Sequence, residues 1–322
     1  MRLILIGASG FIGSHVTRLL VKGGHDVIVF HRGKAPPAPG AREIVGDRRE
    51  LTAHRAEFRA LAPDVVVDFI LSSGVQARGV MDLLRGFTKR VVAVSSCDVY
   101  RACGVLHGTE DGPLQPLPLT ESSDLRSNPE TYGREALRRA REAYPWVDDD
   151  YDKISVELEI RRYPDLPGTV LRLPMVYGPG DPLRRFKSLL TRMAADPNVL
   201  ILEEKLAAWR SPRGYVENVA AAIALAATSE IASGQVYNVA EPDSCSVLDW
   251  ATQIAEAIGW PGRLETLPFD RAPADARMAG NFDQHWVVDS SRIRHELGYR
   301  ESVTRPDALQ RTIAWERSSA AP

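Results

Sequence analysis

The stretch MRLILIGASGFIG, residues 1–13, decides the fold of this chain. Residues 3–6 form a short apolar run that ends at Gly7, which is typical of a parallel strand buried on both faces. After the turn, apolar residues recur at helical spacing as far as residue 20. A strand, a glycine-rich turn and a helix, in this order, open the fold that binds dinucleotides.

The three glycines of this turn each have a physical role. Gly7 permits the tight turn, Gly10 lets the backbone approach a pyrophosphate, and Gly13 lets the helix pack close to the strand. The N-terminus of the helix offers N–H groups and a partial positive charge to the anion. We therefore expect a cofactor-binding turn that consists of Gly7, Ser9, Gly10, Phe11, Ile12 and Gly13.

Length and composition limit the class of protein. The chain has 322 residues, of which 44% are hydrophobic and 25% charged, and this suits one large α/β domain with a smaller lobe. A net charge of −2 gives no general attraction to nucleic acid or to an anionic membrane, and no stretch approaches the roughly 20 apolar residues of a membrane span. Cys97, Cys103 and Cys245 are too few and too scattered for a disulfide framework or a zinc site, and the histidines lack metal-ligand spacing. We expect no metal and a reducing, cytoplasmic location.

Short apolar runs alternate with amphipathic segments along the first half of the chain. This rhythm predicts an α/β protein with a doubly wound parallel sheet, the Rossmann fold. We expect residues 1–180 to form the dinucleotide-binding domain, with residues 213–240 returning to it, and residues 181–212 and 241–322 to form a smaller C-terminal substrate-binding lobe. The predicted strands are residues 3–6, 27–30, 43–45, 65–70, 90–94, 169–173 and 236–239, and the predicted helices include residues 74–86, 135–143, 151–163, 183–195, 246–258, 292–297 and 306–315.

Polar residues stand at the carboxyl ends of the predicted strands, where ligands of such sheets bind. His31 and Arg32 follow the second strand, in the region where NAD-binding folds carry a carboxylate for the ribose. Cations without a carboxylate suit a 2′-phosphate, so we expect NADP rather than NAD; the alternative is a solvated basic loop. Asp47, Ser72 and Ser96 lie at the ends of other strands and complete the expected site.

In order and spacing, these features resemble the extended (or atypical) short-chain dehydrogenase/reductases, the NAD(P)-dependent epimerase/dehydratase family. The resemblance covers nearly the whole chain. It rests on Gly7-x-x-Gly10-x-x-Gly13, Ser95-Ser96-x-x-Val99-Tyr100, Lys153 followed by Glu157, the run LRLPMVYGPG at residues 171–180, Arg213-Gly214-Tyr215-Val216 and Tyr237-Asn238-Val239.

The resemblance implies roles for individual residues. Ser96 would hydrogen-bond the reacting carbonyl or hydroxyl, Lys153 would hold the nicotinamide ribose, and Arg213 would bind a substrate phosphate. Arg184, at the start of the predicted helix 183–195, is a second candidate for substrate binding. Further cofactor contacts are expected from Asp47, Ser72, Pro174 and Val176, with Asp47 at the adenine and Pro174 and Val176 at the nicotinamide.

The chain departs from the family pattern at the acid/base. The family has a tyrosine four residues before the lysine, one helical turn away, where the ammonium lowers the pKa of the phenol. Here Asp149 stands four residues before Lys153, and Tyr151 only two before it. Three interpretations stay open: Asp149 transfers the proton, or an irregular helix start brings Tyr151 or another tyrosine into the site, or the site binds cofactor without redox turnover. A fourth is that the acidic run 148–150 only favours a helix N-terminus.

The two residues after Ser96 bear on the class of reaction. Dehydratases of the family carry an acidic pair there, whereas this chain has Cys97 and Asp98. Loss of the first acid argues against dehydration. No histidine lies near Cys97 in the sequence, so we expect a buried small residue there rather than a nucleophile.

Two classes of function follow. The first is an NAD(P)-dependent oxidoreductase or epimerase that acts on a hydroxyl or carbonyl substrate such as a sugar nucleotide. The second is a redox-inactive, NADP-binding sensor or RNA-associated protein of the same superfamily, and Asp149 is the reason to consider it. The near-neutral charge argues against nucleic acid as a partner. Members of the family often dimerise through two helices of the sheet domain, so the resemblance implies a homodimer through helices 74–86 and 151–163. The catalytic candidates are Ser96, Lys153, Asp149 and Tyr151.

Overall fold

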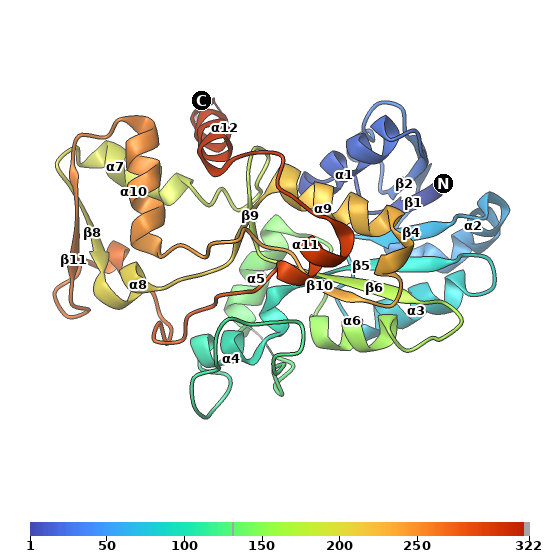
Figure 1. Ribbon diagram of the computed structural model, residues 1–322, viewed down its shortest axis with the longest axis horizontal. Helices are drawn as coiled ribbons and strands as arrows, with labels where there is room; N and C mark the ends of the chain where they lie inside the picture. The colour runs from blue at the N-terminus through green and yellow to red at the C-terminus, as the bar shows by residue number, and fades with distance from the viewer. Residues whose placement is uncertain (131, 319–322) are drawn as a thin grey trace.

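Seven strands form one parallel sheet in the computed structural model, which describes residues 1–130 and 132–318 (Figure 1). The strand order is β10-β6-β5-β4-β1-β2-β3, so the chain winds outward from β1 in both directions. The predicted doubly wound α/β fold is therefore confirmed. The strands are β1 (Arg2–Ile6), β2 (Asp26–His31), β3 (Arg42–Val45), β4 (Val65–Asp68), β5 (Arg90–Ser96), β6 (Gly168–Leu173) and β10 (Val236–Asn238).

Both faces of the sheet are covered by helices, which explains the continuous apolar runs in its strands. In β1, Leu3 and Leu5 belong to the hydrophobic cluster on one face, and Ile4 and Ile6 belong to the cluster on the other. The first cluster includes side chains of α1 (Phe11–Lys22), α9 (Val216–Thr228) and α11 (Ser291–Leu297). The second includes side chains of α2 (Arg55–Leu61), α3 (Gly74–Leu84) and α6 (Lys153–Ile160).

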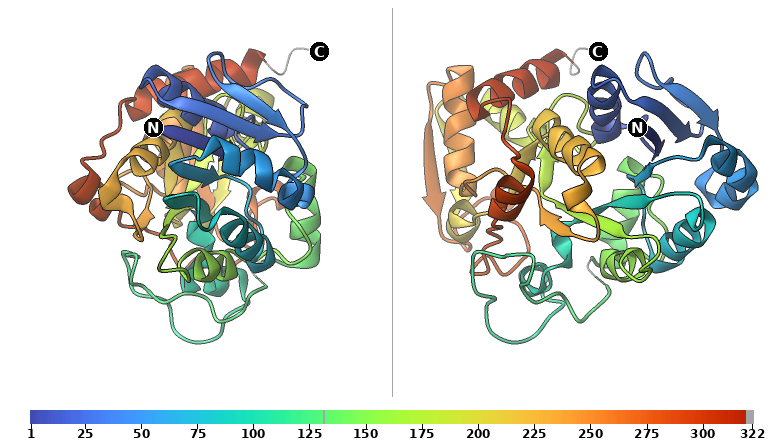
Figure 2. Two further views of the ribbon diagram at one scale, coloured as in Figure 1. Left: turned by 90° about the vertical axis from the view of Figure 1, so that its right-hand side faces the viewer. Right: turned by 45° about the vertical axis from the view of Figure 1, so that its right-hand side comes forward.

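A second lobe lies beside the sheet domain, on the side away from β2 and β3 (Figure 2). The predicted capping box is present, because Ser246 and Asp249 hydrogen-bond each other's backbone at the start of α10. The lobe contains α7 (Lys187–Ala195), β8 (Val199–Glu203), α8 (Glu204–Ala208), α10 (Val247–Ile258), β11 (Arg263–Leu267) and α12 (Arg305–Ser318), and β8 pairs with β11 in parallel.

The remaining elements lie in the connections. Two short strands pair in parallel between the sheet and the lobe, and two helices follow β5. They are β7 (Met175–Tyr177), β9 (Arg213–Tyr215), α4 (Arg101–His107) and α5 (Arg134–Ala143), with 3₁₀ segments at Arg48–His54, Cys97–Val99, Glu230–Ala232 and Ala274–Ala276. No helix in residues 1–130 and 132–318 is long and apolar enough to cross a membrane.

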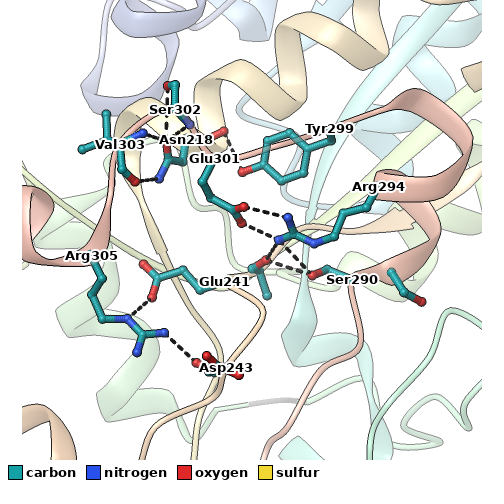
Figure 3. A network of polar contacts seen from close by, with 12 residues as sticks. Asn218, Glu241, Asp243, Ser290, Arg294, Tyr299, Glu301, Ser302, Val303 and Arg305 are labelled. Atoms are coloured by element: carbon teal, nitrogen blue, oxygen red, sulfur yellow. Dashed lines mark hydrogen bonds and ion pairs between the residues drawn. The ribbon is translucent and has the colours of Figure 1, made fainter.

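The C-terminal segment does not stay in the lobe, which differs from the domain division expected for residues 241–322. Helix α11 packs on the sheet domain, and Arg292 at its start donates a hydrogen bond to the Val236 carbonyl of β10 at 3.2 Å. The chain then passes Asn218 of α9, whose side chain binds the backbone of Ser302 and Val303 (Figure 3). Residues 291–303 therefore join the two parts of the molecule.

Candidate functional site

A cavity of about 520 Å³ opens at the carboxyl ends of the strands. The doubly wound topology places it there, because the connections on either side of β1 leave in opposite directions and a crevice forms between them. Fourteen of the residues predicted for the site line this cavity: Gly7, Ser9, Gly10, Phe11, Ile12, Gly13, His31, Arg32, Asp47, Ser96, Tyr151, Lys153, Pro174 and Val176. Four others, Ser72, Asp149, Arg184 and Arg213, do not line it.

The glycine turn is shaped for close approach of a ligand. Gly7 has φ +80°, a conformation that side chains rarely adopt, and a Cβ on Gly13 would lie 2.3 Å from the Ala8 Cα. Beside Gly10 the space is open, with no described atom within 4 Å of an added Cβ. The first turn of α1 has neither a side-chain cap nor an acidic residue, so its N–H groups and its positive dipole end face the cavity. This turn fits a pyrophosphate.

Basic side chains line the end of the cavity near β2. His31 is fixed, since its Nε2 lies 3.0 Å from the Glu43 carboxylate and its Nδ1 accepts the Gly33 N–H. Arg32 is exposed and has no hydrogen bond or ion pair within the described part of the chain. Asp47 caps the following 3₁₀ segment by accepting the Arg49 N–H at 2.9 Å.

A second arginine lines the same region. Arg48 forms a buried ion pair with Asp68 at 2.6 Å, while its Nη2 is buried without a partner among the described residues. A buried donor without a partner is costly, so this nitrogen fits a ligand acceptor in the cavity.

Lys153 is the first residue of α6, and the helix begins later than the family pattern implies. Asp152 is the N-cap, because its carboxylate accepts the N–H groups of Ile154 and Ser155 at 3.0 and 3.1 Å. The Lys153 ammonium donates to the carbonyls of Leu71, in the loop after β4, and Val94, near the end of β5. Burial lowers the pKa of Lys153 to about 8.

Tyr151 precedes the N-cap and reaches the cavity from outside the helix. Its ring centroid lies 5.9 Å from the Lys153 Nζ, and its hydroxyl donates to the Asp98 carboxylate at 2.9 Å. Burial, followed by the charge of Asp98, raises the pKa of the Tyr151 phenol. Ser96, at the end of β5, lines the same cavity, and its Oγ accepts the Asp98 N–H at 3.2 Å. A phenol, a hydroxyl and an ammonium therefore converge at one end of the cavity.

The structure does not bring Asp149 to this centre. Its side chain is 89% exposed and pairs with Arg141, because residue 149 lies before the helix and not one turn along it. The neighbouring Asp148 lines the cavity instead, and it accepts hydrogen bonds from Ser72, Ser73 and Gln76. Ser72 is fully buried and bound to Asp148, which explains why it does not line the cavity.

The two predicted substrate-binding arginines also point elsewhere. Arg184 has φ +46° and binds Glu316 of α12 at 2.8 Å, whereas the next residue, Arg185, lines the cavity and pairs with Asp181. Arg213 stacks on Trp250 at 4.6 Å, and burial lowers its pKa to about 10. The turn at Asp181 precedes α7, so the predicted helix 183–195 begins at Lys187 and its predicted start was wrong. Arg184 lies in this turn, before the helix.

Several residues of the site were missed by sequence reasoning. Trp146 lies 5.1 Å from the Lys153 Nζ, Tyr132 donates to Asp98 at 3.2 Å, and Asp98 itself is almost fully buried. The position of Asp98 two residues after Ser96 was the available signal. Cys97 is buried, which raises the pKa of its thiol and fits the expected packing role. Within the described chain, no group of three His, Cys, Asp or Glu side chains could hold a metal ion.

Comparison with known proteins assigns the family. The NAD dependent epimerase/dehydratase family profile matches residues 3–121 and 139–240. The chloroplast stem-loop binding protein of 41 kDa b from Arabidopsis thaliana is 24% identical over 96% of this chain and 77% of its own, and a Streptomyces dTDP-4-dehydro-6-deoxy-D-allose reductase is 23% identical over 98% and 95%. The structure of dTDP-glucose 4,6-dehydratase from Bacillus anthracis, in complex with NAD, superimposes with a TM-score of 0.69 at 17% identity, covering 99% of this chain and 97% of that one. This chain therefore belongs to the NAD-dependent epimerase/dehydratase family of extended short-chain dehydrogenase/reductases.

Proposed function

We propose that this protein transfers hydride between NADP and a hydroxyl or carbonyl carbon of a sugar nucleotide, as a reductase or an epimerase. The observation that carries the proposal is the convergence of Ser96, Tyr151 and Lys153 at one end of a cavity whose other end is the glycine turn. The family is that of the NAD-dependent epimerases and dehydratases, and the dTDP-sugar reductase is one of the relatives of this chain.

The residues of the cavity fit a dinucleotide. The glycine turn and the N-terminus of α1 would hold the pyrophosphate, Asp47 would lie near the adenine, and Pro174 and Val176 would border the nicotinamide. The bound dinucleotide supplies the hydride donor or acceptor.

The side chains of this chain supply proton handling and orientation. The Ser96 hydroxyl can donate to the reacting oxygen of the substrate, and the Tyr151 hydroxyl can give or receive the proton there. Lys153 fixes the ribose side of the cavity, since its ammonium is anchored to the carbonyls of Leu71 and Val94. Tyr151 and not Asp149 is the proton-transfer group in this proposal, because only Tyr151 lines the cavity.

The preference for NADP is supported by the residues after β2. Arg32 is exposed beside the cavity, and its guanidinium suits a 2′-phosphate. The Glu43 carboxylate pairs with His31, the residue before Arg32, and leaves the guanidinium unneutralised. The Bacillus anthracis dehydratase was solved with NAD, which describes that protein, so a measurement on this one decides between the two dinucleotides.

The experiment has two steps. The purified protein is denatured, and any released nucleotide is identified by mass spectrometry with its redox state. The protein is then incubated with NADPH or NADH and a panel of dTDP- and UDP-linked sugars and keto-sugars, and products are separated by chromatography. We expect NADP(H) in the first step and turnover of one panel member in the second. Unchanged turnover in Ser96→Ala would contradict the proposed site.

A second candidate function is RNA binding, and one observation favours it. The Arabidopsis relative is named a stem-loop binding protein and matches nearly the whole chain. The net charge of −2 does not favour phosphate binding, which normally needs a basic surface. A filter-binding assay with a stem-loop RNA at several salt concentrations tests this function, and the absence of salt-dependent retention excludes it.

A further inference from the structure

The buried carboxylate of Asp98 lies behind Tyr151, and the proposed function alone gives it no part. We propose that Asp98 takes up the proton that Tyr151 passes on, so that proton transfer runs from the substrate oxygen through the phenol to a buried carboxylate. This inference rests on the proposed function and extends it. Asp98 acts through another side chain and is therefore a positioning residue and proton store, while Tyr151 touches the substrate.

The geometry of Asp98 suits a proton acceptor. Its Oδ2 accepts the hydroxyls of Tyr151 at 2.9 Å and Tyr132 at 3.2 Å. Its Oδ1 is buried and has no hydrogen-bond partner in residues 1–130 and 132–318, so one oxygen retains full capacity for a proton. The backbone on either side is held, because the Asp98 N–H binds Ser96 Oγ at 3.2 Å and the Asp98 carbonyl accepts Arg126 Nε at 2.6 Å.

The charges argue against a lasting phenolate at Tyr151. A phenolate 2.9 Å from an ionised carboxylate would place two negative charges side by side in a buried site. The Lys153 ammonium, which relieves such a charge in the family arrangement, donates here to the Leu71 and Val94 carbonyls. A phenol that relays its proton to Asp98 avoids the second negative charge.

The step balances in both directions. During oxidation, the substrate O–H bond breaks and its proton goes to the Tyr151 oxygen, while the Tyr151 proton goes to Asp98. The substrate C–H bond breaks with its electron pair, which reduces the oxidised nicotinamide dinucleotide and leaves a carbonyl product. During reduction the same protons travel in reverse, from protonated Asp98 through Tyr151 to the new hydroxyl.

The groups that face this pair come from four parts of the chain. Their charges and dipoles set the electrostatic potential at Tyr151 and Asp98. A titration of Tyr151 must therefore be interpreted with all of them in view. They are Cys103 and His107 of α4, Arg126 of the following loop, Tyr132 before α5, and Lys153 of α6.

The first test needs no substrate. Protein labelled at the tyrosine Cζ with ¹³C is titrated by NMR, and Tyr151→Phe identifies the signal of Tyr151. In Asp98→Asn we expect Tyr151 to ionise about tenfold more readily, because the neighbouring negative charge is gone. Asp148→Asn is the matched control, since Asp148 lines the cavity but its carboxylate binds Ser72, Ser73 and Gln76 and, among the described residues, not Tyr151. An unchanged Tyr151 titration in Asp98→Asn overturns the inference.

The second test uses the substrate found under the proposed function. Asp98→Asn should lower kcat at least tenfold while KM and the Kd for NADPH stay near wild type. When kcat is plotted against the D₂O fraction, the wild-type curve should fit two transferred protons and the Asp98→Asn curve one. If wild type neither binds a nicotinamide dinucleotide nor turns over a sugar nucleotide, the proposed function fails and the relay fails with it. If wild type turns over and Asp98→Asn is equally fast, the relay alone fails.

Discussion

At the scale of single residues, the position of Tyr151 decides whether the site can move a proton. Tyr151→Phe keeps the ring against Lys153 and removes only the hydroxyl, so kcat should fall about 10²- to 10⁴-fold. The Kd for NADPH, measured by fluorescence titration, should stay near the wild-type value. Asp149→Asn is the control, because that carboxylate is 89% exposed. A large loss in Asp149→Asn with little loss in Tyr151→Phe would restore the first of the three interpretations.

The buried ammonium of Lys153 makes stability depend on pH. Its pKa of about 8 in the folded protein lies below the usual 10.5, so between these values the unfolded chain binds a proton that the folded chain does not. Stability therefore rises with pH in this window, and the penalty is fully present below pH 8. Relative to Lys153→Met, wild type should gain about 2 to 3 kcal/mol of unfolding free energy between pH 7.5 and pH 10. Urea denaturation of both proteins at each pH measures this difference in unfolding free energy. If the unfolding free energies of wild type and Lys153→Met changed equally with pH, the assigned burial of the Lys153 ammonium would be contradicted.

Individual site residues were predictable where the backbone alone sets their place. The glycines of the first turn follow from the strand that precedes them, and the residues at strand ends follow from the parallel topology. Arg184 and Asp98 did not follow, for a physical reason. The orientation of Arg184 depends on a positive φ after Asp181, and the burial of Asp98 depends on two tyrosines that lie 34 and 53 residues further along the chain.

At the scale of elements, the start of α6 explains why the tyrosine and the lysine are two residues apart. Asp152 ends the extended segment and begins the helix, so residue 149 never lies one turn from Lys153. Placing a tyrosine at the family position should therefore fail. The double variant Asp149→Tyr, Tyr151→Phe should turn over no faster than Tyr151→Phe alone in the same assay. Recovery of activity would show that α6 can begin a turn earlier.

The loop after β2 is the element that selects the dinucleotide. Arg32→Glu should raise the Kd for NADPH about 10- to 100-fold, since a charge-assisted contact to the 2′-phosphate is replaced by repulsion. The Kd for NADH should change little. Lys34→Glu alters the same charge two residues away without lining the cavity, and it should leave both constants near wild type. If Arg32→Glu raised the Kd for NADPH and the Kd for NADH equally, Arg32 would act through a general electrostatic effect and not through contact with the 2′-phosphate.

Elements were easier to predict than their ends. Strands such as β1 and β4 were found because residues buried on both faces leave unbroken apolar runs. The starts of α6 and α7 were not found. The start of α6 is set by Asp152, one of four aspartates within residues 148–152, whose carboxylate binds two backbone N–H groups. Before α7, Asp181 binds the N–H groups of Leu183 and Arg185 in a turn, so the helix begins only at Lys187.

At the scale of the whole molecule, Asn218 connects the sheet domain to the returning C-terminal chain. Its Nδ2 donates to the Val303 carbonyl at 2.8 Å, and its Oδ1 accepts the Ser302 and Val303 N–H groups at 3.1 and 3.0 Å. Asn218→Ala leaves the N–H and carbonyl of the buried Val303 without these partners and should cost about 2 to 4 kcal/mol of unfolding free energy in urea. Arg311→Ala removes an exposed pair to Glu217 across the same boundary and should cost less than about 0.5 kcal/mol. Equal costs would mean that Asn218 is not the main connection.

The separate supports of Tyr151 and Lys153 have a consequence for how such a protein can diverge. The phenol is carried by the segment before the N-cap, and the ammonium is carried by the helix and held by the carbonyls of Leu71 and Val94. Loss of the Tyr151 hydroxyl alone can therefore remove proton transfer while the rest of the cavity lining stays in place. Where a single helical turn carries both groups, the same loss disturbs the helix that holds the ribose. In this arrangement, chemistry and nucleotide recognition are separate targets for mutation.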